Sequence, residues 1–158
     1  MAGDEAMLAG WPLPVTDDPV DAGFWSAARR GELVVQACGP CGHRVLPPRP
    51  MCPRCRSVER VWEPVSGRGT IWSWTVAHPP LLPAFMPVAP YAVIVVALDE
   101  DPTLRLVGNL VTDATAAIDS VEPATIVMGE PVHAVFAPAA DDVSLVRWVR
   151  ATEPGGSP

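Results

Sequence analysis

Four cysteines in two closely spaced pairs constrain the fold of this chain more than any other feature of its sequence. The first pair is Cys38 and Cys41, with two residues between them. The second pair, Cys52 and Cys55, has the same spacing and lies ten residues further on. Two such pairs on tight turns can place four thiolates at the corners of a tetrahedron, which suits Zn²⁺. We therefore predict one structural zinc ion, because four thiolates leave no open coordination position and the binding energy folds the segment around them.

Other uses of the cysteines stay open at this point. Two disulfides are disfavoured in the cytoplasm, where we expect the protein because Asp4 and Glu5 replace a basic start and no apolar signal core follows. A thioredoxin-like redox pair needs a βαβ context that the sequence lacks. Iron is compatible with four thiolates and would make the chain an electron carrier, which the colour of the purified protein would reveal.

The remainder of the chain has the pattern of short β-strands. Residues 70–77 alternate, which predicts that Trp72, Trp74 and Val76 share one face. Residues 91–98 form a continuous apolar run, typical of a strand covered on both faces, and it is too short to span a membrane. Further strands are expected at 33–37, 58–62, 104–111, 132–136 and 144–149. The five main strands after residue 66, with no long helix among them, predict a small closed barrel of the five-stranded OB type.

The charge balance bears on what the chain can bind. It has 18 acidic and 11 basic residues, all of the latter arginine, for a net charge of −7. Nucleic-acid affinity depends largely on neutralising phosphates, so this balance argues against a nucleic-acid-binding module. That alternative is kept because OB-folds and zinc ribbons often serve it, and because Trp72 and Trp74 can stack on bases.

No catalytic constellation is recognisable. His43 lies in the cysteine segment and is expected on an exposed turn, and His133 is expected to face solvent. His78 ends a tryptophan-rich strand, but no serine, cysteine or carboxylate pattern supplies a nucleophile with a partner base. We therefore predict no catalytic residue and expect the chain not to be an enzyme by itself.

Residues 78–90 form an unusual loop. It contains five prolines together with Leu81, Leu82, Phe85, Met86 and Val88. Prolines exclude it from a central strand, yet its side chains are too apolar to be left wholly in water. The loop either packs back over the barrel mouth or forms a docking surface or ligand lid. Gly67-Arg68-Gly69 is expected to be a hairpin turn, with phosphate binding through its backbone amides as the weaker interpretation.

An ordered series of motifs runs through residues 24–150. Besides the cysteine pairs it comprises Phe24-Trp25, Gly31-Glu32-Leu33, Pro47-Pro48-Arg49-Pro50, Val65-Ser66-Gly67-x-Gly69-Thr70, Trp74-Thr75-Val76, Pro90-Tyr91, Gly108-Asn109-Leu110 and Gly129-x-Pro131-Val132. This series resembles a bacterial and archaeal family of zinc-ribbon OB-fold proteins associated with acyl-CoA metabolism, long catalogued as a domain of unknown function.

The resemblance implies a mainly β fold with an N-terminal helical segment, a rubredoxin-like zinc ribbon and a C-terminal five-stranded OB-fold barrel. Spacing supports the helix, since Phe24, Trp25 and Ala28 fall on one face before Gly31. We divide the chain into a flexible arm (1–23), a helical segment (24–32), the zinc ribbon (33–61), the OB-fold (62–150) and a flexible tail (151–158).

The resemblance also implies a role. Such proteins are non-catalytic partners of thiolase-superfamily enzymes, including lipid-transfer-protein-like aldolases of steroid side-chain degradation, and some work beside hot-dog-fold enoyl-CoA hydratases. The implied function is an accessory subunit of a hetero-oligomeric thiolase or aldolase complex that acts on acyl-CoA C–C bonds, with a hydratase partner as the alternative. Expected contacts to the partner or to acyl-CoA are Arg68, Trp72, Trp74, His78, Leu81, Leu82, Phe85, Met86 and Tyr91, with the loop 78–90 as the main contact.

Overall fold

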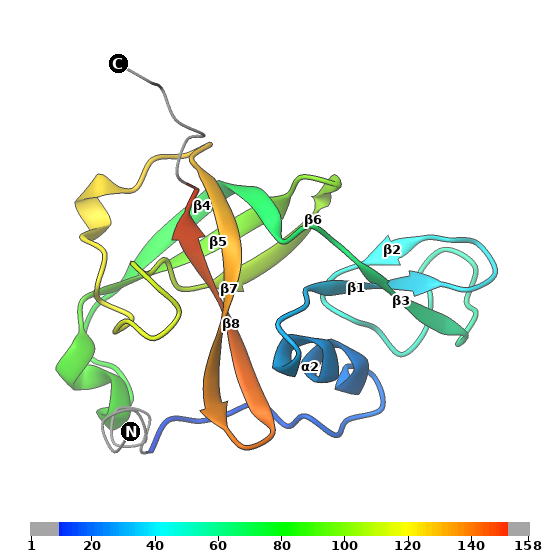
Figure 1. The fold of residues 1–158 in the computed structure, drawn as a ribbon, viewed down its shortest axis with the longest axis horizontal. Helices are drawn as coiled ribbons and strands as arrows, with labels where there is room; N and C mark the ends of the chain where they lie inside the picture. The colour runs from blue at the N-terminus through cyan, green and yellow to red at the C-terminus, as the bar shows by residue number, and fades with distance from the viewer. Residues whose placement is uncertain (1–9, 152–158) are drawn as a thin grey trace.

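The computed structural model describes residues 10–151, and its strands form two antiparallel sheets with a short helix between them (Figure 1). The helix α2 (Ala22–Arg29) buries Phe24, Ala27 and Ala28, and it packs against strands of both sheets. The predicted helical segment is confirmed. None of the helices that the structure describes is long and apolar enough to cross a membrane.

The smaller sheet is the zinc ribbon. It consists of β1 (Val34–Cys38), β2 (Arg44–Val45) and β3 (Arg60–Pro64), in the order β2-β1-β3. Every residue of β1 is buried, because the strand lies between its two neighbours and belongs to the central core. The expected boundary between residues 61 and 62 falls inside β3, which pairs along the whole of β1.

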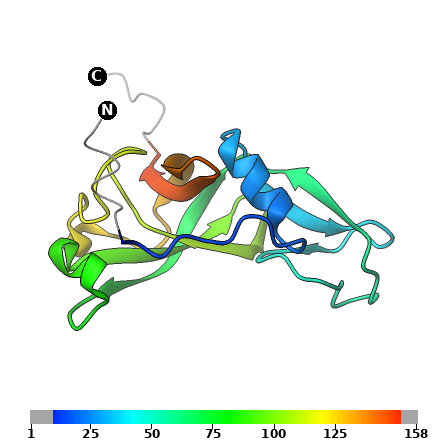
Figure 2. The same ribbon diagram turned by 90° about the horizontal axis from the view of Figure 1, so that it is seen from below.

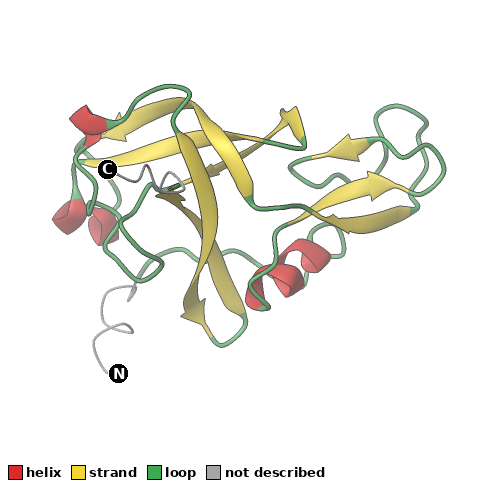
Figure 3. Cartoon of the chain, turned by 45° about the horizontal axis from the view of Figure 1, so that its top comes forward, coloured by secondary structure: helices red, strands yellow, loops and turns green. Residues whose placement is uncertain are grey.

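The larger sheet is a curled half-barrel of five strands. They are β4 (Arg68–Ala77), β5 (Tyr91–Leu98), β6 (Asp101–Gly108), β7 (Pro131–Ala140) and β8 (Val143–Arg150), in the order β6-β5-β4-β7-β8. The 3-10 helix η1 (Pro83–Val88) lies between β4 and β5, and η2 (Pro123–Thr125) lies between β6 and β7. The mainly β fold with a five-stranded OB-type sheet is confirmed (Figure 3). Its core residues include Ile71, Ile94, Leu104 and Trp148, and the same cluster contains Val34 and Val35 of the ribbon.

The two edges of the half-barrel meet at one short parallel bridge between Leu110 and Trp148. The backbone N–H of Trp148 donates to Asn109 O at 2.9 Å, and the backbone N–H of Val111 donates to Trp148 O at 2.8 Å. Gly108 permits this approach, because a Cβ there would lie 2.8 Å from Cδ1 of Trp148. The motif Gly108-Asn109-Leu110 therefore has a structural reason, which is closure of the barrel beside a large buried ring.

The strands β7 and β8 form a long hairpin that extends past the rest of the sheet toward α2 (Figures 1 and 3). The ladder between β7 and β4 runs only over residues 131–133 of β7, and the Ala134 N–H still donates to Gly67 O just before β4. Beyond Ala134 the strand β7 pairs with β8 alone. A register shift lies between Pro138 and Ala140. Proline is tolerated there because edges and bulges do not require its missing N–H.

The alternation predicted for β4 is interrupted. The pairing with β5 shifts between Ile71 and Ser73, so Trp72 is an extra residue in a β-bulge. Trp72 is exposed, whereas Trp74 is partly buried and packs against the core. The prediction that the two tryptophans share a face is therefore wrong, because the bulge reverses the alternation between them.

Residues 10–21 run along the molecule from η1 toward α2 without regular secondary structure (Figure 2). Thr16 Oγ1 donates to Asp142 Oδ2 at 2.8 Å, and Arg60 Nη1 donates to Pro19 O at 2.9 Å. The arm therefore contacts both the half-barrel and the ribbon. The first nine residues of the expected flexible arm, and all but the first residue of the expected tail at 151–158, lie outside the described residues.

Candidate metal centre and contact residues

Two loops with matching hydrogen bonds hold the cysteines. In the first loop the Gly42 N–H donates to Cys38 O, and the Cys38 N–H donates to His43 O. In the second, the Arg56 N–H donates to Cys52 O, and the Cys52 N–H donates to Ser57 O. The fourth position after each leading cysteine has a left-handed backbone, with φ of 67° at Gly42 and 66° at Arg56. Glycine suits this conformation at position 42, whereas Arg56 adopts it without being glycine.

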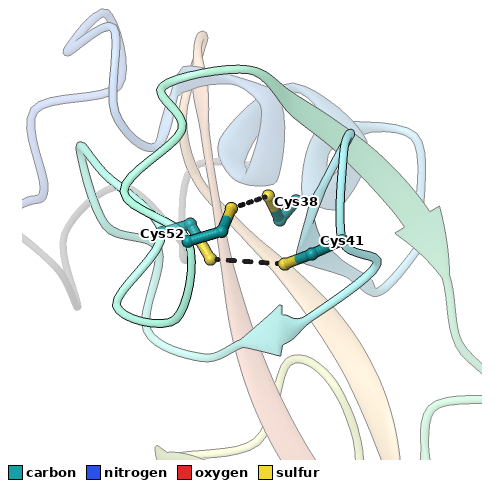
Figure 4. Close-up of side chains that lie close together, drawn as sticks. Cys38, Cys41 and Cys52 are labelled. Atoms are coloured by element: carbon teal, nitrogen blue, oxygen red, sulfur yellow. Dashed lines mark hydrogen bonds between the residues drawn. The ribbon is translucent and has the colours of Figure 1, made fainter.

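The four sulfur atoms lie together (Figure 4). Cys38 Sγ is 3.3 Å from Cys55 Sγ, Cys41 Sγ is 3.7 Å from Cys52 Sγ, and all four sulfurs are within 4.8 Å of one another. These separations exceed the S–S bond of about 2.05 Å, so the cysteines are free thiols. Cys38 and Cys52 are buried, and Cys55 is exposed.

The crowded thiols hold their protons unequally. The N–H of Cys41 lowers the pKa of Cys38, but burial and hydrogen bonds with the other thiols raise it to about 12. Backbone N–H groups of Cys55 and Arg54 lower the pKa of Cys52 to about 6 despite burial. Four thiolates this close together require a cation to offset their mutual repulsion.

The donor set fits a structural zinc ion. A tetrahedral site with Zn–S bonds of about 2.3 Å has sulfur–sulfur edges of about 3.8 Å, close to the separations observed. Zinc would join the two cysteine loops to each other and fix the end of β1. Iron accepts the same four ligands, so the donors alone do not distinguish the two metals.

Gln36 is a supporting residue that the sequence analysis missed. It is buried in β1, its Nε2 donates to Arg49 O at 2.9 Å, and its Oε1 accepts from Arg49 N at 2.8 Å. This double hydrogen bond fixes the proline-rich loop between the cysteine pairs to the central strand of the ribbon. The sequence signal for this contact is a single glutamine within an apolar strand, because a buried side-chain amide requires hydrogen-bond partners.

The loop 78–90 is partly packed and partly exposed. Phe85 lies between Trp11 and Tyr91, with ring centroids 4.7 Å and 6.0 Å away, and Trp11 Nε1 donates to Ala84 O at 3.2 Å. Leu81 is half-buried. Leu82 and Met86 are 59% and 45% exposed. Of the four apolar contact residues expected in this loop, Leu82 and Met86 are therefore the ones available to a partner.

The remaining expected contact residues are dispersed. Arg68 is exposed at the start of β4 and pairs with Asp99 at 3.7 Å, and His78 is exposed just after the end of β4. His133 is exposed on β7, as predicted, whereas His43 is half-buried in the ribbon. The prediction of a hairpin turn at Gly67-Arg68-Gly69 is wrong, because Arg68 and Gly69 belong to β4, and the preceding strand β3 lies in the other sheet. Both glycines still have a structural reason, since Gly67 has a φ of 73° and a Cβ at Gly69 would collide with Ala97 O.

Two family descriptions match the chain. "ChsH2, rubredoxin-like zinc ribbon domain" matches residues 25–59, and "ChsH2, C-terminal OB-fold domain" matches residues 62–137. A DUF35 domain-containing scaffold protein from Methanothermobacter thermautotrophicus is 32% identical over 109 residues, which cover 68% of this chain and 74% of that protein.

Two longer curated proteins are also similar. A probable enoyl-CoA hydratase alpha subunit from Thermomonospora curvata is 40% identical over 115 residues. The 3-oxo-4,17-pregnadiene-20-carboxyl-CoA hydratase alpha subunit of Mycobacterium tuberculosis is 32% identical over 127 residues. The matches cover 71% and 79% of this chain but 32% and 36% of those proteins, so the chain spans about a third of their length.

Among solved structures, a chain of the Ltp2-ChsH2(DUF35) aldolase is 32% identical with a TM-score of 0.73, and the match covers 88% of this chain and all of that one. A DUF35-family protein of unknown function from Sulfolobus solfataricus is 13% identical with a TM-score of 0.53, covering 94% of this chain and 93% of that one. The second likeness concerns the fold alone.

Proposed function

Because the chain belongs to the family of ChsH2 zinc-ribbon and OB-fold domains, also described as DUF35, we propose that it is a non-catalytic accessory subunit of a thiolase-superfamily complex that acts on C–C bonds of acyl-CoA. The match to the Ltp2-ChsH2(DUF35) aldolase carries the proposal, since it covers the whole of the matched chain at 32% identity. The zinc has a structural role in this function.

The placement of the titratable groups supports a non-catalytic role. The side chains of His78 and His133 are exposed and belong to different parts of the half-barrel, after β4 and in β7. The cysteines are grouped as metal ligands. We therefore assign the reacting groups to the partner enzyme and expect no acyl-CoA turnover by the isolated chain.

We further propose that the loop 78–90 contacts this partner near its acyl-CoA entrance. Leu82 and Met86 supply exposed apolar side chains, and Phe85 is already fixed by Trp11 and Tyr91. Prolines restrict the unfolded loop, so ordering it at an interface costs less entropy than for an ordinary loop.

Co-expression with a thiolase-superfamily aldolase subunit from the same genome tests the proposal. We expect a complex in size-exclusion chromatography, aldolase turnover by the complex and none by the chain alone. The double variant Leu82→Ala/Met86→Ala should weaken the complex about tenfold or more without altering zinc content. Its matched control is Val127→Ala/Met128→Ala, a pair that is one methylene smaller and also exposed. Robust turnover by the isolated chain would contradict the non-catalytic assignment.

A partnership with an enoyl-CoA hydratase is the alternative, and the 40% identity to the Thermomonospora curvata alpha subunit favours it. Co-expression with a hydratase subunit of the same genome distinguishes the two. A complex with the hydratase subunit and none with the aldolase subunit would replace the first proposal.

A further inference from the structure

We infer that the outer face of β4, β5 and β6 is a second docking surface, which receives an apolar area bearing a carboxylate on the partner subunit. Its centre, which we call the outer patch, consists of Trp72, Val95, Arg105 and Val107. The inference rests on the proposed function, because the partner is the acyl-CoA enzyme subunit. The surface is separate from the loop 78–90.

The strand register places these side chains on one face. Val95 pairs directly with Val107, and Ala97 pairs with Arg105, which lies two residues before Val107 in the antiparallel strand. Residues two apart on a strand point to the same side, so Arg105 and Val107 face outward together. The bulge in β4 turns Trp72 to this side as well, whereas Trp74 beyond it faces the core. Bulges commonly re-aim a side chain in this way.

The patch is apolar, exposed and already ordered. Trp72 is 48% exposed and Val107 is 58% exposed. The guanidinium carbon of Arg105 lies 3.7 Å from the centroid of a Trp72 ring, a cation–π contact that holds both side chains in place. Tryptophan and arginine are the residue types most often found at the energetic centre of protein interfaces, and pre-ordered side chains lose less entropy on binding.

The free charge of Arg105 indicates what the partner presents. The ion pairs of the described residues use Arg30, Arg44, Arg68 and Arg150, and none uses Arg105. A guanidinium that lies flat on a ring still has N–H groups at its edge, which match a carboxylate in a bidentate pair. A partner surface with an apolar side chain over Trp72 and an Asp or Glu beside Arg105 complements the patch.

A nucleotide fits the patch less well. Phosphates require several cations, and the patch has one in a chain of net charge −7. The nearby Arg68 is paired with Asp99. The patch residues also lie on the face of a sheet, whereas small ligands bind in concave sites.

The test measures the affinity of the complex obtained by co-expression, for the wild type and for Trp72→Ala, Arg105→Ala and Arg105→Lys. Arg29→Ala serves as the control, since Arg29 is an exposed arginine on α2, which packs against β1, β7 and β8. We expect Trp72→Ala and Arg105→Ala each to weaken binding about thirtyfold, as at interface centres. Arg105→Lys should have a smaller effect, and zinc content and thermal unfolding should be unchanged. Coenzyme A is titrated against the isolated chain by tryptophan fluorescence.

The outcomes separate the two proposals. If the patch variants bind normally while Leu82→Ala/Met86→Ala weakens the complex, the outer patch is not a docking surface, and the proposed function is retained. If the wild type binds neither an aldolase subunit nor a hydratase subunit, both the proposed function and the inference about the outer patch are wrong. If coenzyme A quenches the fluorescence and Arg105→Ala abolishes that quenching, the patch is a nucleotide site and the protein partner is wrong.

Discussion

The cysteine loops of the ribbon and the half-barrel differ in how much apolar surface they bury. Among residues 38–58 only Cys38 and Cys52 are buried, and the apolar side chains of Met51 and Val58 are exposed. The half-barrel encloses Ile71, Ile94 and Trp148 at 1% exposure or less. Burial of such side chains contributes roughly 2 kcal/mol each, whereas the loops have no comparable source of stability except a metal. One molecule thus combines a metal-dependent part and a core-dependent part.

Loss of a zinc ligand should give the largest effect, and it should be confined to the ribbon. Apparent binding energies of structural zinc are about 10–16 kcal/mol, so Cys52→Ser should lose the metal and unfold residues 38–57 locally. Val34 and Val35 belong to the common core and should keep the start of β1 in place. Elemental analysis and hydrogen exchange check this, with slow exchange retained in β5. A metal-free wild type with two disulfides by mass would contradict the zinc assignment.

Removal of the Trp148 side chain should destabilise the half-barrel and leave the metal site intact. Trp148 is fully buried beside Gly108, and replacing a buried tryptophan with alanine costs about 3–5 kcal/mol. Trp148→Ala should lower the thermal unfolding temperature of the whole chain, while zinc stays bound at lower temperatures. Zinc loss at temperatures where β5 is still protected would show that the ribbon depends on the barrel more directly than we expect.

A substitution at the junction should disturb both parts. A Cβ at Gly23 in α2 would lie 2.0 Å from Nε1 of Trp62 in β3, so Gly23→Ala must move the helix or the ring, at about 1–3 kcal/mol. Chemical denaturation measures the loss, and Ser26→Ala on the exposed side of the helix is the control. Adding Trp62→Phe should restore part of the loss, since it removes the crowded atom. If Trp62→Phe restores none of the lost stability, the helix does not pack against Trp62 as described.

The corresponding positions of the two cysteine loops, Arg56 and Gly42, should respond to opposite substitutions with opposite and smaller changes in stability. Arg56 and Gly42 have nearly the same left-handed φ, a conformation that costs a non-glycine residue roughly 1–2 kcal/mol. Arg56→Gly should therefore raise the stability of the zinc-bound ribbon by roughly 0.5–1 kcal/mol, after the greater freedom of glycine in the unfolded chain is subtracted. Gly42→Ala should lower it by about 1 kcal/mol. Zinc competition with a chelator measures both, and equal signs for the two variants would refute the explanation.

The smallest expected effect depends on pH. Burial raises the pKa of Glu100, but the hydroxyl and N–H of Ser66 and the charge of Arg68 lower it below its ordinary value of 4.5. A lowered pKa stabilises the fold fully above pH 4.5, and the contribution is lost as the pH falls through the lower folded value. Glu100, Ser66 and Arg68 are all exposed, so Glu100→Gln should lower the free energy of unfolding by less than about 1 kcal/mol at pH 7. The difference in this free energy between the variant and the wild type should shrink toward pH 3. A constant difference across this range would contradict the ionic origin.

The fold and the metal site could be predicted because both depend on local sequence. The cysteine spacing specifies four ligands on two turns, and the apolar runs specify strands such as β5. The contacts missed join distant positions. The ring of Trp11 packs at a tilt against Phe85, which is 74 residues away, and the pairing of β4 with β5 creates the bulge at Trp72. Neither feature has a local signal, because the first joins two segments that lie outside the strands and the second arises only when two strands are in register.

The far half of the β7–β8 hairpin has a consequence for how copies of this chain behave in a concentrated solution. An unpaired strand edge is a template for another chain, and proteins commonly block such edges with proline or with bends. Beyond Ala134 the edge of β7 away from β8 lacks a β4 partner, and both devices are present at Pro138, where the register also shifts. An incoming strand would meet a position without a donor on a strand that bends. Edge-to-edge aggregation through this hairpin is therefore disfavoured.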